Sequence, residues 1–171
     1  TNREKVVLLE KVLVKIGLCP VFSDFLFERD SVFSGTGRER AEALMNFYQD
    51  REIQMIFDIS GGDIANEILP YLDFEVIAEN PKPFWGYSDL TTIMNAIYAK
   101  TGVRSVLYQI RNLLREDGKT QITNFTSTIF DGTNHLFSFE YQFIQGERLE
   151  GIVVGGNIRC LLKLAGTEYW P

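Results

Sequence analysis

Apolar side chains recur at three- and four-residue intervals in five stretches of this chain, which predicts five helices. The stretches are residues 4–16, 38–49, 64–72, 91–100 and 158–164. Gly17, Gly102 and Gly166 follow three of them, and glycine is the residue that most often terminates a helix. The second helix should bury one stripe, made of Ala41, Leu44, Met45 and Tyr48.

Short apolar runs between these helices predict strands. Residues 53–59 form a nearly continuous apolar run, as expected of a central parallel strand that is covered on both faces. Residues 18–22, 80–85 and 103–108 also have strand character, and residues 74–78 form a connecting segment for which a strand is one option. Alternation of helix and strand indicates an α/β fold with a doubly wound, mostly parallel sheet.

The pattern changes after about residue 115. Residues 121–154 show little helical period, and alternating runs at 136–143 and 149–154 flank a Gln-Gly-Glu-Arg turn, which indicates a β-hairpin. We therefore expect an N-terminal α/β nucleophile domain over residues 1–115, and a linker with part of a β-rich second domain over residues 116–171. A parallel sheet normally opens on a strand, so the first strand of this sheet is expected before Thr1.

Composition narrows the class of protein. The 171 residues are 45% hydrophobic and 13% aromatic, which excludes a disordered chain. The net charge of −6 argues against nucleic acid as a partner, and no apolar run is long enough to span a membrane. Cys19 and Cys160 lie in apolar contexts without metal-binding spacing, so we expect two buried, reduced thiols in a cytoplasmic protein.

Ser88 is the strongest candidate for a catalytic residue. It lies in Gly-Tyr-Ser-Asp-Leu, residues 86–90, between the predicted strand at 80–85 and the helix at 91–100. A serine at such a corner projects its hydroxyl above a helix N-terminus, as nucleophiles of α/β hydrolytic enzymes do. A serine that only caps the helix would fit the same pattern, so the residues themselves leave both roles open.

A second loop leaves the sheet at Gly61-Gly62, directly after the strand at 53–59. Ligands of open parallel sheets bind beyond the carboxyl ends of strands, so this loop and Ser88 can face one pocket. The backbone N–H groups of Gly61, Gly62 and Asp89 could then stabilise a developing oxyanion, although a tight turn would also explain the glycines.

The pattern does not supply a general base. His135 is the only histidine, and its loop context favours a solvated side chain. Asp89 adjoins Ser88, but a carboxylate there stabilises the helix start as readily as it takes part in catalysis.

Several short blocks, in order, resemble the LD-carboxypeptidase family of serine peptidases. The blocks are Ser34-Gly35-Thr36 with residues 38–41, Ser60-Gly61-Gly62-Asp63 with residues 68–73, Asn80-Pro81-Lys82, Gly86-Tyr87-Ser88-Asp89, residues 99–102, and residues 155–158 with residues 164–169. This family includes murein-tetrapeptide LD-carboxypeptidases and microcin-immunity peptidases.

The resemblance implies that Ser88 is the nucleophile of a Ser-Glu-His triad, with Gly61, Gly62 and the Asp89 N–H at the oxyanion hole. The family's Glu and His lie beyond the block that ends at Tyr169, so Glu168 is not the catalytic Glu. By this mapping residues 1–171 lack two triad members and are inactive alone, while the parent enzyme releases a C-terminal D-amino acid from a muropeptide in the cytoplasm.

The resemblance implies no metal or organic cofactor, and it leaves open a homodimer. Two alternatives to the LD-carboxypeptidase remain. One is a microcin-immunity-type peptidase or amidase with the same nucleophile, and the other is a catalytically dead domain that binds a muropeptide.

Overall fold

The computed structural model describes residues 2–27 and 34–171, and the chain divides into two compact units. Unit 1 comprises Thr1–Val6, Val21–Ile110 and Val154–Pro171, and unit 2 comprises Val7–Pro20 and Arg111–Val153. The C-terminal segment therefore belongs to the same unit as the sheet, from which it is far removed in sequence.

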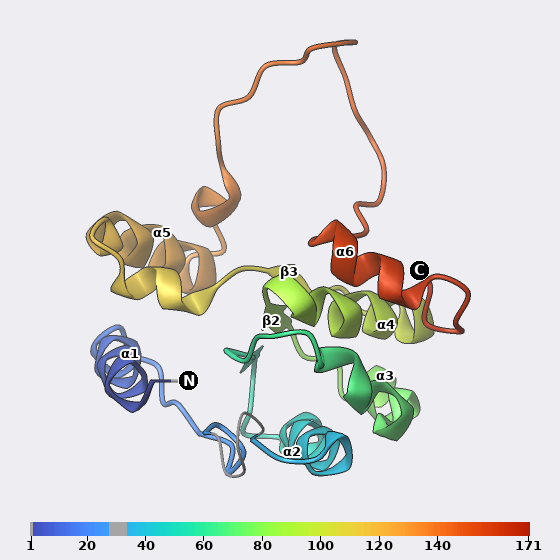
Figure 1. The fold of residues 1–171 in the computed structure, drawn as a ribbon. Coiled ribbons are helices and arrows are strands. Elements are labelled where there is room, and N and C mark those ends of the chain that lie inside the picture. Colours follow the sequence, from blue (N-terminus) through green and yellow to red (C-terminus); the bar gives the residue numbers. More distant parts are fainter. Residues whose placement is uncertain (1, 28–33) are drawn as a thin grey trace. The chain divides into compact units, whose positions relative to one another are not determined.

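The sheet of unit 1 has three described strands, β1 (Ile56–Phe57), β2 (Phe84–Gly86) and β3 (Val106–Leu107). They lie side by side in chain order, and both pairings are parallel (Figure 1). This confirms the predicted α/β class with a parallel sheet, although the strands are shorter than the apolar runs that predicted them.

Aromatic rings line one row across this sheet. The rings of Phe57 and Trp85, which are partners in the register of β1 and β2, lie 5.2 Å apart between centroids. The ring of Trp85 meets that of Tyr108 edge-on at 6.0 Å. Offset and edge-to-face contacts are the arrangements that aromatic pairs prefer, so this row ties the three strands together.

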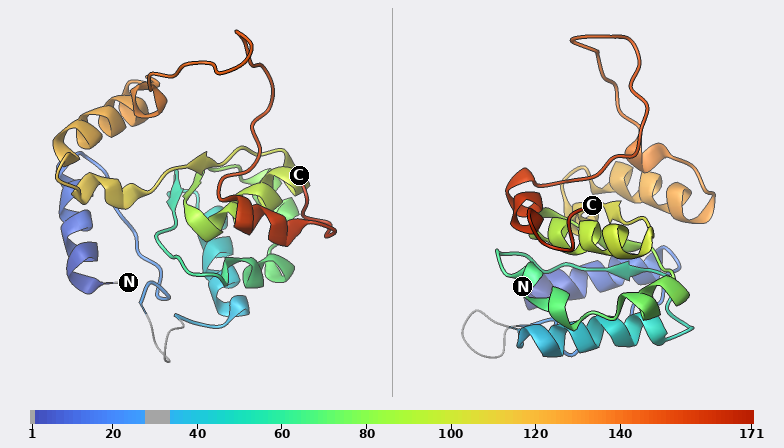
Figure 2. Two further views of the ribbon diagram at one scale, coloured as in Figure 1. Left: turned by 45° about the horizontal axis from the view of Figure 1, so that its top comes forward. Right: turned by 90° about the vertical axis from the view of Figure 1, so that its right-hand side faces the viewer.

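The helical elements of unit 1 lie close together (Figure 2), and all of them except α6 contribute buried side chains to one hydrophobic core. These elements are α2 (Gly37–Gln49), η1 (Ala65–Tyr71), α3 (Phe74–Glu79), η2 (Ser88–Leu90), α4 (Thr91–Thr101), α6 (Ile158–Leu161) and η5 (Leu162–Leu164). Every residue of α4 from 91 to 97 is buried, so this helix lies inside the core of the unit. The sequence pattern predicted an amphipathic helix with one exposed face.

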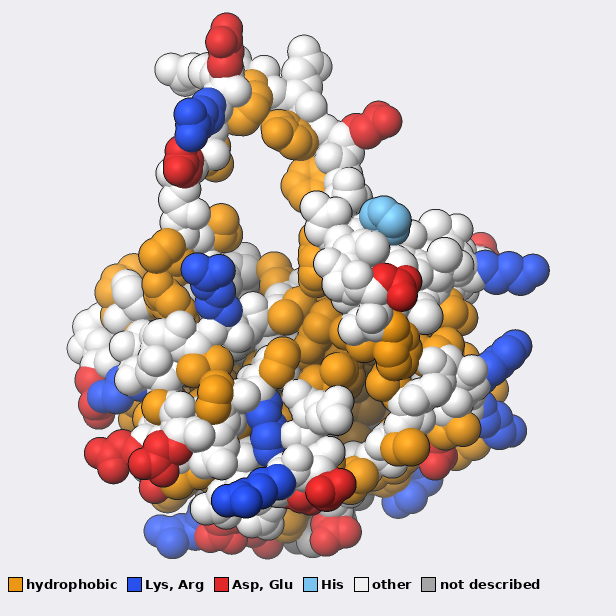
Figure 3. Space-filling view, turned by 180° about the vertical axis from the view of Figure 1, so that it is seen from behind, with side chains coloured by type: hydrophobic (Ala, Val, Ile, Leu, Met, Phe, Trp, Pro, Cys, Tyr) orange, Lys and Arg blue, Asp and Glu red, His pale blue; other side chains and the backbone are white. Residues whose placement is uncertain are grey.

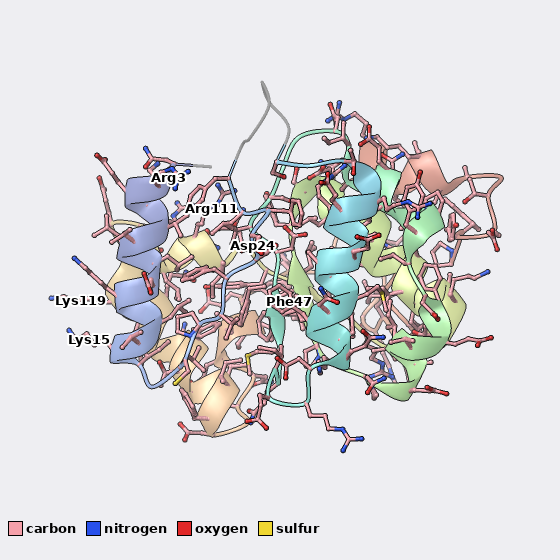
Figure 4. The ribbon with its side chains drawn as sticks, turned by 90° about the horizontal axis from the view of Figure 1, so that it is seen from below. Arg3, Lys15, Asp24, Phe47, Arg111 and Lys119 are labelled. Atoms are coloured by element: carbon pink, nitrogen blue, oxygen red, sulfur yellow. The ribbon has the colours of Figure 1, made fainter. Side chains whose placement is uncertain are left out.

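Helix α2 follows its sequence closely. Its four predicted core residues are all buried, and a capping box between Thr36 and Glu39 starts it. Lys82 stabilises the opposite end, because its Nζ donates to the carbonyl oxygens of Phe47 (2.8 Å; Phe47 is labelled in Figure 4), Tyr48 (2.7 Å) and Asp50. A cation at the carboxyl end of a helix satisfies carbonyls that have no partner inside the helix.

Two predicted strands are not strands. Residues 74–78 lie in helix α3, because Asp73 caps it through hydrogen bonds from the Glu75 and Val76 N–H groups, both 3.1 Å. Residues 18–22 have no strand pairing in the described chain; the Leu18 N–H instead closes the end of α1 by donating to the Leu13 carbonyl at 3.0 Å.

Helices form the ordered elements of unit 2. Helix α1 (Arg3–Lys15, with both end residues labelled in Figure 4) confirms the first predicted helix, and Leu9 and Leu13 on it are buried. The sequence pattern missed α5 (Gly118–Phe130), which buries Phe125 completely. Its many β-branched residues are typical of strands and hide the helical period. The short turns η3 (Ile110–Leu114) and η4 (His135–Phe137) precede and follow it.

The predicted hairpin is not formed in the described chain. Residues 138–154 contain no strand, and Figure 3 shows hydrophobic side chains exposed along this segment beside charged ones. Phe139 is 76% exposed and Leu149 86%. A two-stranded ribbon is marginal unless another element covers its apolar face, and no element of unit 2 that the structure describes does so.

The two cysteines differ from each other. Cys160 is buried, as predicted, but Cys19 is exposed, because the segment that carries it is not a strand inside the core. Within the described ranges no helix is long and apolar enough to cross a membrane.

Candidate active site

Ser88 occupies the corner between β2 and α4, as the sequence predicts. Its φ of +61° makes it the single described residue other than glycine with a left-handed backbone. This region is costly for residues with a Cβ atom, by about 1–2 kcal/mol, and such strain is concentrated at functional sites. A residue that only capped a helix would adopt an extended backbone, so the conformation favours the nucleophile over the cap.

Gly86 makes the corner possible. A Cβ atom at this position would lie 2.9 Å from Leu90 Cβ and 3.1 Å from Leu90 Cδ1, which is closer than real Cβ contacts. Because Leu90 is buried in the turn that contains Ser88, the chain can fold back this tightly only with glycine before the turn.

The Gly61-Gly62 loop leaves the same edge of the sheet as Ser88. β1 and β2 are parallel neighbours, so the loops that follow them share one edge. Both glycines are exposed, nothing lies within 4 Å of either Cβ position, and Gly62 has a φ of +124°. Among the described residues, neither glycine N–H donates a hydrogen bond. Both are therefore open to a ligand.

The Asp89 side chain links the turn at Ser88 to the segment that follows the Gly61-Gly62 loop. Its side chain is 1% exposed, and its Oδ2 accepts a hydrogen bond from the Ala65 N–H at 3.3 Å, just beyond the glycine loop. Its Oδ1 is buried and has no partner among the described residues. Burial, together with the nearby charge of Asp58, raises the pKa of the Asp89 carboxyl above its usual value, although the hydrogen bond from Ala65 opposes the shift.

Asp58 is the second carboxyl of this region, and it is the first residue after β1. Its Oδ1 accepts a hydrogen bond from the Ser60 N–H at 2.7 Å, which shapes the start of the glycine loop. Burial raises its pKa, while the Ser60 hydrogen bonds and the Arg40 charge act in the opposite direction. The sequence signal for this residue was its place at the carboxyl end of a central strand, which the motif analysis did not use.

The C-terminal segment contacts the start of α4, directly after the turn that contains Ser88. Thr91 is the first residue of α4, and its Oγ1 accepts a hydrogen bond from the Asn157 N–H at 3.0 Å. The Thr92 hydroxyl in turn donates to the Asp89 carbonyl at 2.9 Å. The start of α4 is thus held both by its own side chains and by a segment more than sixty residues away in sequence.

His135 belongs to unit 2 and is exposed, in agreement with the solvated side chain that its loop predicts. Its Nδ1 lies 3.4 Å from Ser127 Oγ at the end of α5, and Ser127 Oγ also accepts a hydrogen bond from the Thr133 hydroxyl. These contacts give the imidazole a local structural role.

Comparison with known proteins assigns the chain to a family. Residues 1–108 match the model of the LD-carboxypeptidase N-terminal domain. This match covers more than half of the chain, so the chain belongs to the LD-carboxypeptidase family, as the motif resemblance predicted.

Relatives and a solved structure agree with this assignment. The chain is 29% identical over 169 residues to the microcin C7 self-immunity protein MccF of Escherichia coli, across 81% of this chain and 49% of that protein. It is 28% identical over 165 residues to the probable murein peptide carboxypeptidase of Bacillus subtilis, across 92% and 51%. The crystal structure of an MccF-like protein from Bacillus anthracis matches with a TM-score of 0.80 and 29% identity, over 99% of this chain and 59% of that one. The chain spans about half the length of the curated relatives it matches.

Proposed function

We propose that this chain carries the nucleophile and the oxyanion hole of a serine LD-carboxypeptidase, which hydrolyses the bond between an L-centre and a C-terminal D-amino acid of a muropeptide. The observation that carries the proposal is the left-handed backbone of Ser88 at the end of β2. Membership of the LD-carboxypeptidase family supports the reaction class. The name of the Bacillus subtilis relative supports a murein peptide as the substrate.

In the proposed reaction, Ser88 Oγ attacks the carbonyl carbon of the scissile peptide while a base accepts the hydroxyl proton. The carbonyl oxygen becomes an oxyanion, which accepts hydrogen bonds from the N–H groups of Gly61 or Gly62 and of Asp89. When the C–N bond breaks, the base returns the proton to the departing amine. Water then hydrolyses the Ser88 ester and regenerates the hydroxyl.

The base and its orienting carboxylate are expected outside residues 1–171, as a His and a Glu. We do not assign Asp58 or Asp89 as the base, because each carboxyl already accepts a backbone hydrogen bond, from the Ser60 and Ala65 N–H groups respectively. A positioned base contributes on the order of 10²–10⁴-fold, and losing triad members that act as a unit costs roughly 10⁶-fold. We therefore propose that residues 1–171 alone do not turn over. The setting we propose is cytoplasmic peptidoglycan recycling.

The test is release of D-alanine from an L,D-linked tetrapeptide. We expect turnover by the full gene product that contains this chain, loss of turnover on Ser88→Ala, and none by residues 1–171 alone. His135→Ala serves as the matched control and should leave the full gene product active. Turnover by residues 1–171 that His135→Ala abolishes would overturn the assignment of the base.

A second candidate function uses the same nucleophile on a different acyl substrate. It is favoured by the similarity to the microcin C7 self-immunity protein, which nearly equals that to the murein peptide relative. A parallel assay with aspartyl sulfamoyl adenosine, the ligand of a solved MccF complex, separates the two enzymes, because each would cleave its own substrate through Ser88. A muropeptide-binding domain without catalysis would bind the tetrapeptide and leave both substrates intact.

A further inference from the structure

The segment after Gly61-Gly62 is gripped by two cations from the C-terminal part of unit 1. Arg159 of α6 makes a two-pronged ion pair with Asp63, with Nη2 2.6 Å from Oδ1 and Nη1 3.2 Å from Oδ2. Lys163 of η5 donates from Nζ to the Asp63 carbonyl oxygen at 2.7 Å. One residue of the loop is therefore held through both its side chain and its backbone.

With these contacts, the residues on both sides of the two glycines are held by hydrogen bonds or ion pairs. On the near side the Ser60 N–H is bound by Asp58, and on the far side Asp63 is bound by the two cations and the Ala65 N–H by Asp89. Glycine has the greatest backbone freedom of any residue, so a two-glycine loop keeps one shape only if its flanks are fixed. These flanking contacts are supplied by the side chains of Asp58 and Asp89 and by side chains of the C-terminal segment.

The two cations lie one helical turn apart, so they present to the loop from one face of the α6–η5 segment. Lys163 is the more enclosed of the two, with 26% of its side chain exposed against 68% for Arg159. The charge of Lys163 also acts on Asp89 and lowers the pKa of that carboxyl against the larger effect of burial. Lys163 thus acts on both sides of the proposed oxyanion hole.

We propose that Arg159 and Lys163 are positioning residues, which hold the Gly61-Gly62 loop in the geometry that oxyanion stabilisation needs. The catalytic consequence of this inference rests on the proposed function. The restraint of the loop by Arg159 and Lys163 can be measured without catalysis. Because exposed ion pairs contribute little to global stability, the effect should be local to the loop.

The experiment compares Arg159→Ala, the double variant Arg159→Ala/Lys163→Ala and Arg159→Lys in the full gene product. Hydrogen exchange of the Ala65 amide, which donates to Asp89 beside the loop, should rise about two- to fivefold in Arg159→Ala, the factor that one exposed ion pair supports. In the double variant kcat should fall about tenfold with KM unchanged, short of the roughly 10²–10³-fold cost of deleting an oxyanion donor. Arg159→Lys keeps the positive charge, so its amide exchange and its kcat should both stay close to the wild-type values.

Lys100→Ala is the matched control, because it removes an equally short exposed ion pair, with Glu168 at 2.6 Å, without touching the loop. It should change neither exchange of the Ala65 amide nor kcat. Unchanged exchange in the double variant overturns the grip. Faster exchange with unchanged kcat, in a protein that Ser88→Ala inactivates, overturns the positioning role. If Ser88→Ala leaves the activity intact, the proposed function and the catalytic consequence both fail, and the exchange data still decide whether the loop is gripped.

Discussion

Asn95 binds both backbone polar groups of Gly155. Its Nδ2 donates to the Gly155 carbonyl oxygen and its Oδ1 accepts from the Gly155 N–H, each at 2.9 Å, while Nδ2 also donates to the Thr91 carbonyl at 2.7 Å. Asn95 is 4% exposed and Gly155 is half-buried, so water has limited access to these bonds. A buried amide on α4 thereby fixes the point at which the C-terminal segment enters unit 1.

Replacing this amide should therefore loosen the C-terminal segment. Asn95→Ala leaves the two backbone groups of Gly155 without their partner, and each unsatisfied buried group costs about 1–3 kcal/mol. We expect a fall of that order in the free energy of unfolding in urea, with faster proteolysis near residue 155. Asn46→Ala, on the exposed face of α2, is the control and should change neither. Equal stability of the two variants would contradict the anchoring role.

Relief of backbone strain at Ser88 should stabilise the protein while removing the proposed nucleophile. Ser88→Gly permits the φ of +61° without a Cβ penalty, so we expect the free energy of unfolding to rise by about 1 kcal/mol. Chemical denaturation measures the gain. Ser138→Gly is the comparison, because Ser138 has a φ of −82° and should gain nothing. A Ser88→Gly variant that is less stable than the wild type would show that the corner is not strained.

Gly86→Ala should deform the corner. The new Cβ would meet Leu90 Cβ at 2.9 Å, an atom close to the backbone that cannot swing away. Overpacking of this kind costs about 1–3 kcal/mol, and the shift should also displace Ser88 and reduce acylation. Gly151→Ala controls for the loss of glycine, since nothing lies within 4 Å of its Cβ position and its φ is not positive. Normal stability and acylation in Gly86→Ala would show that the turn relaxes without loss.

The buried carboxyl of Asp89 should make stability depend on pH. Because burial raises its pKa above 3.8, the folded protein holds this proton more tightly than the unfolded chain. Its contribution to stability is thus present below 3.8 and is lost as the pH rises through the folded pKa. Asp89→Asn cannot ionise, so its stability relative to the wild type should improve as the pH rises from roughly 4, until the folded carboxyl of the wild type has ionised.

Urea unfolding at several pH values measures this difference. Asp131→Asn, on the exposed surface, provides the reference and should follow the wild type throughout. A stability difference between Asp89→Asn and the wild type that stays constant over this range would mean that Asp89 does not carry the extra proton.

Local patterns were sufficient where an element is specified by its own residues. The stripe of α2 and its capping box lie within one helix, and the strand, corner and helix around Ser88 follow one another directly. The short motifs also led to the family, because they depend on order along the chain. The parallel sheet followed from the alternation of apolar runs with helices, although its paired strands proved shorter.

Tertiary structure decided the features that need a distant partner. Alternation at 136–154 predicted a hairpin, but a strand forms only where another element covers its apolar face, and the described part of unit 2 offers none. Asp63 and Arg159 meet across 96 positions, and Asn95 and Gly155 across 60. No local period encodes such pairings. The sequence alone thus located the proposed nucleophile and the glycine loop, and the fold determined what holds them in place.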